Sequence, residues 1–242
     1  MSGVNKMISN IRIGCAGWSI DRQSASRFPG EGSHLQRYAT VLNAAEINSS
    51  FYKPHQASTY ARWAESVPDE FRFSVKLPRS ISHYQKLVGI DDLLARFAAE
   101  AGTLGDKLGC ILVQLPPSLV FDLKVADGFF ERLHESFKCD FACEARHGSW
   151  FGDEATELMK RHRVTRVIAD PPAGQAGVFV PTTDTVYARL HGSPRIYYSP
   201  YEEKYLNQVA DYLKKHPGWC IFDNTASGAA LPNALELMAK VG

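Results

Sequence analysis

Short apolar segments recur at regular intervals along the chain, and segments of helical period lie between most of them. The apolar segments are five or six residues long and are typical of buried strands. They lie at residues 11–15, 44–48, 71–76, 110–115, 141–146, 166–170, 186–191 and 219–224. Alternating strands and helices favour a parallel sheet. Eight such units predict a closed (β/α)8 barrel of the TIM type.

The intervening segments carry the apolar stripes that amphipathic helices need. Clear stripes occupy residues 35–42, 60–67 and 231–238, and Pro68 ends the second of them. Residues 171–185 differ, because they begin with two prolines and show no helical period. We therefore expect a loop in place of the sixth helix.

Neither a linker nor a low-complexity stretch interrupts this pattern. The sequence predicts one barrel domain over residues 11–242, preceded by a short N-terminal lead-in at residues 1–10.

Polar residues occupy one face of several predicted strands, close to the C-terminal ends. A strand has period two, so Glu144 and Arg146 point to one face while Cys143 and Ala145 point to the other. Burial of such charges costs several kcal/mol each unless they are paired. Other strands end in the same way, with Glu46 and Asn48, Ser74 and Lys76, Gln114, Arg189 and His191, and Asp223 and Asn224.

Barrel enzymes keep their sites at the C-terminal ends of the strands. We therefore interpret these polar positions as one site at the mouth of the barrel. The alternative is a buried ion network that only holds the barrel together.

Composition narrows the class of protein. Of the 242 residues, 27 are Lys or Arg and 26 are Asp or Glu, so nothing indicates a nucleic-acid partner. No apolar run approaches the roughly 20 residues that span a bilayer, and the N-terminus lacks a secretory apolar core. The five cysteines form no CxxC pair and are typical of small buried residues in a reducing compartment. We expect a cytoplasmic protein, and the sequence leaves its oligomeric state open.

Seven ordered segments carry a family resemblance: IGCAGWS, EINSSFYKP, FRFSVKLPRSISH, LGCILVQLPPS, CEARHGSW, YARLHGS and IFDNTASGAALPNA. Together they resemble the domain-of-unknown-function 72 family, the YecE-like proteins, and they extend from Ile11 to Ala234. The resemblance implies a (β/α)8 barrel and leaves the activity unassigned. The matching positions include Gly17, Trp18, Glu46, Asn48, Phe51, Tyr52, Lys76, His83, Gln114, Pro116, Pro117, Glu144, Arg146, His147, Trp150, Arg189, His191, Gly192 and Asn224.

The first functional hypothesis is an enzyme that acts on a small phosphate- or carboxylate-bearing substrate. Lys76, Arg146 and Arg189 would bind the anion. Glu144 or Glu46 would be the general base, with His191 as acid or electrophile. Further substrate contacts are expected from Asn48, Gln114, His147, Trp18, Tyr52, Trp150 and Asn224.

Other hypotheses stay open. A metal-dependent hydrolase or isomerase would draw its ligands from Glu46, Glu144, Asp170, His147 and His191. A non-catalytic module would use the aromatic and cationic residues to bind a ligand or a nucleic acid. A glycosidase would use Glu46 and Glu144 as its carboxylate pair. The chain has no Walker loop and no GxGxxG fingerprint, so no cofactor is assigned, and a divalent metal stays possible.

Overall fold

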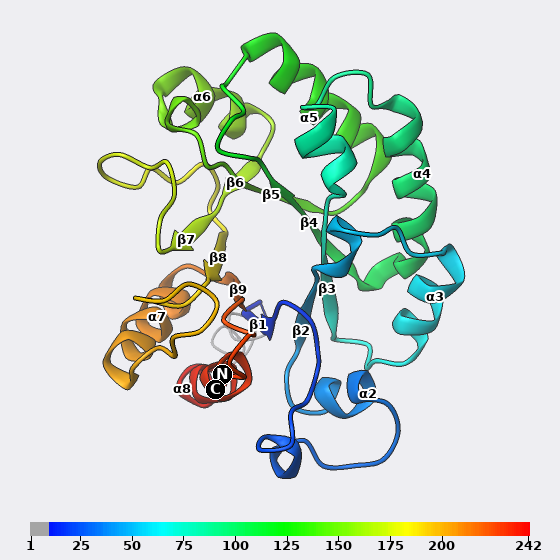
Figure 1. The fold of residues 1–242 in the computed structure, drawn as a ribbon, viewed down its shortest axis with the longest axis vertical. Coiled ribbons are helices and arrows are strands. Elements are labelled where there is room, and N and C mark those ends of the chain that lie inside the picture. Colours follow the sequence, from blue (N-terminus) through cyan, green and yellow to red (C-terminus); the bar gives the residue numbers. More distant parts are fainter. Residues whose placement is uncertain (1–9) are drawn as a thin grey trace, which may run out of the picture.

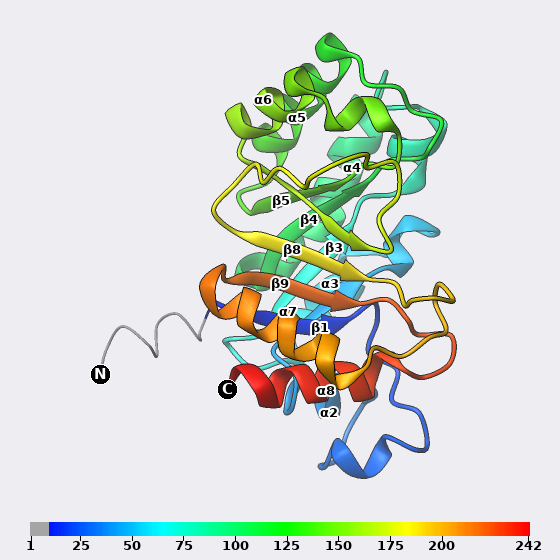
Figure 2. The same ribbon diagram turned by 90° about the vertical axis from the view of Figure 1, so that its left-hand side faces the viewer.

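Two parallel sheets form the centre of the computed structural model, which describes residues 10–242. Nearly all of the lead-in expected at residues 1–10 lies outside the described part. One sheet has the order β1 (Arg12–Cys15), β9 (Gly218–Phe222), β8 (Val186–Leu190) and β7 (Ile168–Asp170). The other has the order β2 (Ala44–Ile47), β3 (Arg72–Lys76), β4 (Leu108–Gln114), β5 (Asp140–Glu144) and β6 (Val164–Arg166). Figure 2 shows β8, β9 and β1 side by side with their C-terminal ends together.

Seven α-helices of the described chain lie outside the curved path of the strands (Figure 1). They are α2 (His34–Ala39), α3 (Ala57–Glu65), α4 (Asp91–Ala101), α5 (Leu123–Ser136), α6 (Asp153–Arg161), α7 (Glu203–Lys215) and α8 (Ala230–Val241). Residues 171–185, all of which are described, contain no helix, so the loop expected between the sixth and seventh strands is confirmed. Within residues 10–242, no helix has the length and apolar character that a membrane span requires.

All eight predicted strand segments contain a strand, but the closed barrel is not what the structure shows. The sixth segment is divided at Val167 into β6, which pairs with β5, and β7, which pairs with β8. Val167 itself donates its N–H to the Cys143 carbonyl at 3.0 Å. Between β1 and β2 there is only an isolated bridge from Ala16 to Glu46. Within residues 10–242 the backbone ladders therefore form two parallel sheets that do not close into one ring.

Side chains replace the backbone ladder where β1 passes β2. The Tyr38 hydroxyl accepts a hydrogen bond from the Cys15 N–H at 2.8 Å and donates one to the Ala44 carbonyl at 2.9 Å. The side chain of Asn43 accepts from the Ile13 N–H at 2.9 Å. Because these side chains satisfy the backbone groups that a strand partner would use, the two sheets meet here without a continuous ladder.

The strands carry different apolar clusters on their two faces. The larger cluster lies between strands and helices and includes Ile13, Phe73 and Phe222 together with helix residues. The smaller cluster contains no helix residue and consists of Ala44, Cys110, Leu112, Ala142, Val167, Tyr187, Trp219 and Ile221. Its strand residues point to the same face as the predicted polar residues, but they lie nearer the N-terminal ends of the strands. The face turned away from the helices is therefore apolar at one end and polar at the other.

Close approach of β1 to β2 makes Gly14 sensitive to substitution. A Cβ atom at Gly14 would lie 1.9 Å from the Ala44 carbonyl oxygen, so Gly14→Ala forces the backbones apart. We expect a loss of roughly 1–3 kcal/mol in the free energy of unfolding, measured by urea denaturation. Gly102→Ala is the control, because a Cβ there meets nothing within 4 Å. Equal stability of the two variants would contradict the close contact.

Candidate functional site

Arg189 of β8 lies at the centre of a buried group of charges at the C-terminal ends of the strands. Its side chain is 0% exposed. Nε and Nη2 donate to the two carboxylate oxygens of Glu46 at 2.9 and 2.6 Å, and Nη1 donates to Glu144 at 2.9 Å. Nη2 also lies 3.2 Å from Asp223. Because Glu46 and Glu144 belong to the other sheet, this guanidinium connects the two sheets.

We refer to Arg189, Glu46, Glu144, Asp223, Arg146, His191 and Lys76 as the polar cluster. Tyr187, two residues before Arg189 on the same face, extends it toward the apolar end. The Tyr187 hydroxyl donates toward Ser74 Oγ and Glu46 Oε2, at 2.7 and 3.0 Å. The predicted strand phase is thus observed on both sheets.

Arg146 connects the cluster to solvent. Its Nη2 donates to Glu144 Oε1 at 2.8 Å and to Gln114 Oε1 at 3.3 Å, and 22% of its side chain is exposed. Burial alone would raise the pKa of Glu144, but Arg189, His191 and Arg146 outweigh burial and hold that pKa well below its usual range. Glu144 is therefore a stable carboxylate at neutral pH and a weak base.

His191 follows β8, and each of its ring nitrogens faces a carboxylate. Nδ1 lies 2.9 Å from Asp223 Oδ2. Nε2 is buried and makes no hydrogen bond to any described residue, although Glu144 Oε1 lies 3.3 Å away. Burial lowers the pKa of His191, but the hydrogen bond to Asp223 and the charge of Glu144 outweigh it, and the pKa is raised. The raised pKa favours the protonated ring, the imidazolium, which has a proton to donate.

Lys76 at the end of β3 is the third cation of the cluster. It is 4% exposed, and among residues 10–242 its Nζ makes no ion pair within 4.0 Å and no hydrogen bond. Nζ lies 4.3 Å from the centroid of the Phe51 ring. Burial first, and then the positive charge of Arg189, lower the pKa of Lys76 to about 8.

Two amide oxygens that follow the strands on either side of β1 are also without partners. Asn48 follows β2 and Asn224 follows β9, and the Oδ1 atom of each is buried with no hydrogen bond in the described structure. The Asn224 side-chain nitrogen donates to the Ser199 carbonyl and to Asn233, so its orientation is fixed. Buried polar groups are normally paired, and unpaired ones at strand ends point to ligand contacts.

The two predicted tryptophan contacts lie among the helix-side packing instead. Trp150 is 1% exposed, and its Nε1 already donates to the Leu119 carbonyl at 3.0 Å. Trp18 packs edge-on against Trp63 of α3 and Phe73 of β3, at centroid distances of 5.0 and 6.0 Å. We therefore leave both tryptophans out of the site.

The roles of two further predicted contacts also differ from expectation. His147 caps the short helix Gly148–Phe151 by accepting from the Ser149 N–H at 3.2 Å. Tyr52 is 60% exposed and packs beside Arg79 outside the buried cluster. These side chains stabilise loops after the strands, and we do not assign them to the ligand.

Asp223 is the main participant that sequence reasoning did not assign a role. Its position at a strand end was visible, but its pairing with His191 depends on how β8 and β9 align in register. Tyr187 was also missed, although its spacing of two and four residues from Arg189 and His191 placed it on the same face.

The carboxylates of the cluster converge on Arg189 rather than on a common empty point. Within residues 10–242, no group of three His, Cys, Asp or Glu side chains has the arrangement of a metal site. Asp170 contributes only its backbone carbonyl nearby, which accepts from the His191 N–H at 2.8 Å.

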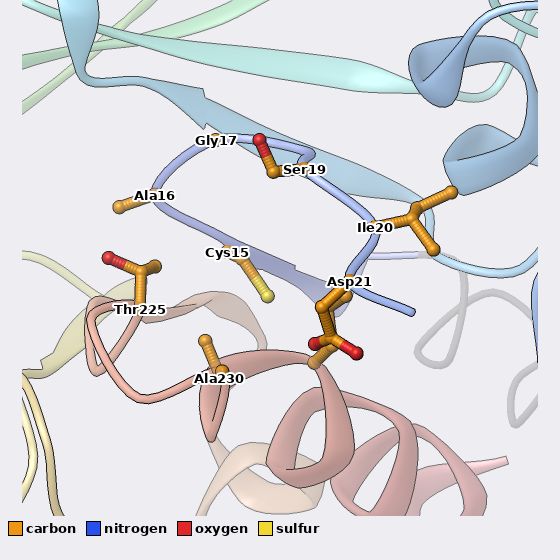
Figure 3. A pocket seen from close by; sticks show the side chains of 10 residues that line it. Cys15, Ala16, Gly17, Ser19, Ile20, Asp21, Thr225 and Ala230 are labelled. Carbon is orange, nitrogen blue, oxygen red and sulfur yellow. The ribbon is translucent and has the colours of Figure 1, made fainter. Parts of the chain in front are cut away.

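A separate cavity of about 370 Å³ lies beside the ends of β1 and β9. Figure 3 shows Cys15 and Asp21 pointing toward the first turn of α8, which Ala230 begins. Burial raises the pKa of Cys15 to about 12, so its sulfur is a thiol and a poor nucleophile. None of the predicted site residues lines this cavity.

The structure is that of an α/β protein with parallel sheets and a cluster of buried charges at its strand ends. The sequence matches the family described as "Protein of unknown function DUF72" over residues 12–242, and the chain belongs to that family. The resemblance inferred from the seven segments is therefore confirmed.

Individual relatives agree with this assignment. The UPF0759 protein YecE of Escherichia coli K12 is 32% identical over 142 residues, which cover 56% of this chain and 52% of YecE, so the match spans about half of that relative. The UPF0759 protein YunF of Bacillus subtilis is 24% identical and covers 94% of this chain and 93% of its own length.

Solved structures of DUF72 proteins share the fold. The Enterococcus faecalis protein has a TM-score of 0.78 at 21% identity, over 96% of this chain and 95% of its own. The Thermotoga maritima protein has a TM-score of 0.75 at 24% identity, over 95% of this chain and 98% of its own.

Replacement of Arg189 tests the pairing of the buried charges. Arg189→Met leaves Glu46 buried without a cation and removes one cation each from Glu144 and Asp223, and we expect a loss of about 3–5 kcal/mol in the free energy of unfolding near pH 8. In the wild type the depressed pKa of Glu144 contributes stability above its unfolded pKa. In Arg189→Met the pKa of Glu144 is higher than in the wild type. The difference in free energy of unfolding between wild type and variant should therefore become smaller as the pH falls toward 5.

Arg166→Met is the matched control, measured by urea denaturation at the same pH values. Arg166 is also buried, at 4% exposure, but its guanidinium donates to neutral oxygens, those of Val180, Trp150 and Thr156. The loss in free energy of unfolding caused by Arg166→Met should therefore be the same at each pH. If the loss caused by Arg189→Met were also the same at each pH, the carboxylates that contact Arg189 would not be charged partners.

Proposed function

We propose that this protein is an enzyme that performs general acid–base chemistry on a small phosphate- or carboxylate-bearing substrate at the C-terminal ends of its strands. The observation that carries the proposal is His191 Nε2. This nitrogen is buried and without a hydrogen bond in the described structure, while Asp223 holds the other nitrogen of the ring. A buried imidazole oriented by a carboxylate is the arrangement that proton transfer requires.

The electrostatic balance of the cluster favours an anionic ligand. Lys76, Arg146 and Arg189 oppose Glu46, Glu144 and Asp223, so the cluster is neutral until His191 is protonated. The raised pKa of His191 then adds one uncompensated positive charge. A buried site with one excess cation attracts a phosphate or carboxylate.

Within the cluster the cations take different roles. Arg189 is fully buried and all three of its nitrogens contact carboxylates, so we assign it to positioning rather than to substrate binding. Lys76 has no carboxylate partner, and Arg146 is partly exposed, so these two side chains would bind the anion. Gln114, Asn48 and Asn224 are placed to contact its polar groups.

The depressed pKa of Glu144 changes the expected assignment of the base. A carboxylate stabilised by Arg189 and Arg146 does not readily accept a proton. In this proposal Glu144 orients Arg146 and stabilises protonated His191, and His191 transfers the proton.

Replacement of His191 should affect the rate of turnover more strongly than it affects the free energy of unfolding. A panel of small phosphorylated and carboxylated compounds, followed by NMR, would reveal turnover by the wild type. His191→Gln should lower the rate about 10²–10⁴-fold, because it removes the proton donor. His134→Gln, on α5 and away from the cluster, is the control. Unchanged turnover in His191→Gln would contradict the assigned role.

Anion binding has its own test. Inorganic phosphate should raise the melting temperature of the wild type beyond the effect of sodium chloride at the same ionic strength. Arg146→Gln should remove this gain, because Arg146 is the partly exposed cation of the cluster. Arg161→Gln, which loses only a surface pair with Asp127, should retain it. Equal gains in both variants would place phosphate binding elsewhere.

A further inference from the structure

Lys76 differs from the other cations of the polar cluster in having no counter-charge in contact. Arg189 pairs with Glu46 and Glu144, and Arg146 pairs with Glu144. No carboxylate among residues 10–242 comes within ion-pair distance of Lys76 Nζ. Its close neighbour is the face of Phe51 at 4.3 Å, which stabilises a cation less than a carboxylate does.

We propose that Lys76 is a nucleophile that forms an imine with a small aldehyde or ketone carrying a carboxylate or phosphate group. This inference rests on the proposed function and deepens it by naming the substrate class. The same amine is buried at a strand end, free of ion pairs, in a cluster that also contains an acid and an anion-binding arginine.

Protonation supports the geometric argument. A lysine reacts with carbonyl carbon only as the neutral amine. With a pKa of about 8, roughly one Lys76 side chain in ten is neutral at pH 7, against fewer than about one in a thousand for an exposed lysine. Burial and the neighbouring Arg189 produce the shift, which the charges of Glu46, Glu144 and Asp223 only partly offset.

His83 is the remaining titratable neighbour. Its ring packs edge-on against Phe51 at 4.9 Å, on the ring that also contacts Lys76. Burial lowers the pKa of His83, and the positive charges of Lys76 and Arg146 lower it further. A neutral His83 adds no further charge beside the amine, although Arg146 and Arg79 are also near this ring.

The proposed step balances without an added oxidant or reductant. The lone pair of Lys76 Nζ attacks the carbonyl carbon, a C–N bond forms, and the C=O π pair moves to oxygen, which takes up a proton. The resulting carbinolamine loses its hydroxyl group as water after a second protonation, for which His191 is the available acid. Loss of protons from nitrogen completes the balance, and one water leaves for each imine formed.

Reductive trapping tests the proposal directly. The native protein is incubated at pH 7 with glyoxylate, an aldehyde that carries a carboxylate, and with cyanoborohydride. Hydride reduces any imine to a stable carboxymethyl-lysine, which peptide mass spectrometry locates. We expect Lys76 to be modified about tenfold faster than Lys53, an exposed lysine shortly after β2.

Three controls separate chemistry from charge and folding. Lys76→Arg keeps the positive charge but should lose the modification at this position. The second control is acetaldehyde, an aldehyde without the carboxylate. The ratio of the modification rate at Lys76 to that at Lys53 should be lower with acetaldehyde than with glyoxylate. Arg146→Gln should abolish that preference for glyoxylate. The melting temperature of each variant shows whether it is folded.

The outcomes distinguish this inference from the function on which it rests. Modification of Lys76 no faster than that of Lys53 would overturn the imine proposal. If phosphate still stabilised the protein through Arg146 in that case, the anion-binding proposal would stand without the imine. If phosphate binding also failed, both would be wrong.

Discussion

The guanidinium of Arg189 is the interaction on which the rest of the site depends. It is fully buried and contacts Glu46 and Glu144, which belong to the opposite sheet, as well as Asp223. Desolvation of four charges costs several kcal/mol each, and removal of Arg189 would leave Glu46 without a cation in contact. Because the backbone ladders do not form a continuous ring, this ionic contact between the sheets fixes the relative positions of the strand ends. The site is therefore arranged before any ligand binds.

A division between paired and unpaired groups within the cluster is the observation on which the proposed site rests. Arg189 and Glu46 have partners on each polar atom that faces the interior. In contrast, His191 Nε2 is buried without a hydrogen bond, and Lys76 is buried without an ion pair in the described residues. A buried polar group without a hydrogen bond has an energetic cost, which makes these two groups candidates for ligand contacts. In our proposal, His191 transfers the proton and Lys76 is the nucleophile.

Much of this arrangement could be predicted from the sequence, because the period of a strand determines which side chains share a face. The phase of Glu144 and Arg146 was sufficient to place them in one cluster with Arg189. The sequence could not show that the Tyr38 side chain would replace backbone pairing between β1 and β2, since that contact joins a helix to two strands. Trp150 was also ambiguous, because a tryptophan after a strand can contact a ligand or fill a core.

The charge state of His191 tests the account most directly. Its ring should be followed by NMR across pH 5 to 9, with the resonances assigned through His191→Gln. The account predicts a pKa above the usual value of about 6.5 and a further change in the ring signals when phosphate is added. A pKa below that value, with ring signals that phosphate leaves unchanged, would show a neutral buried histidine and contradict the central claim that the cluster holds an acid for an anionic substrate.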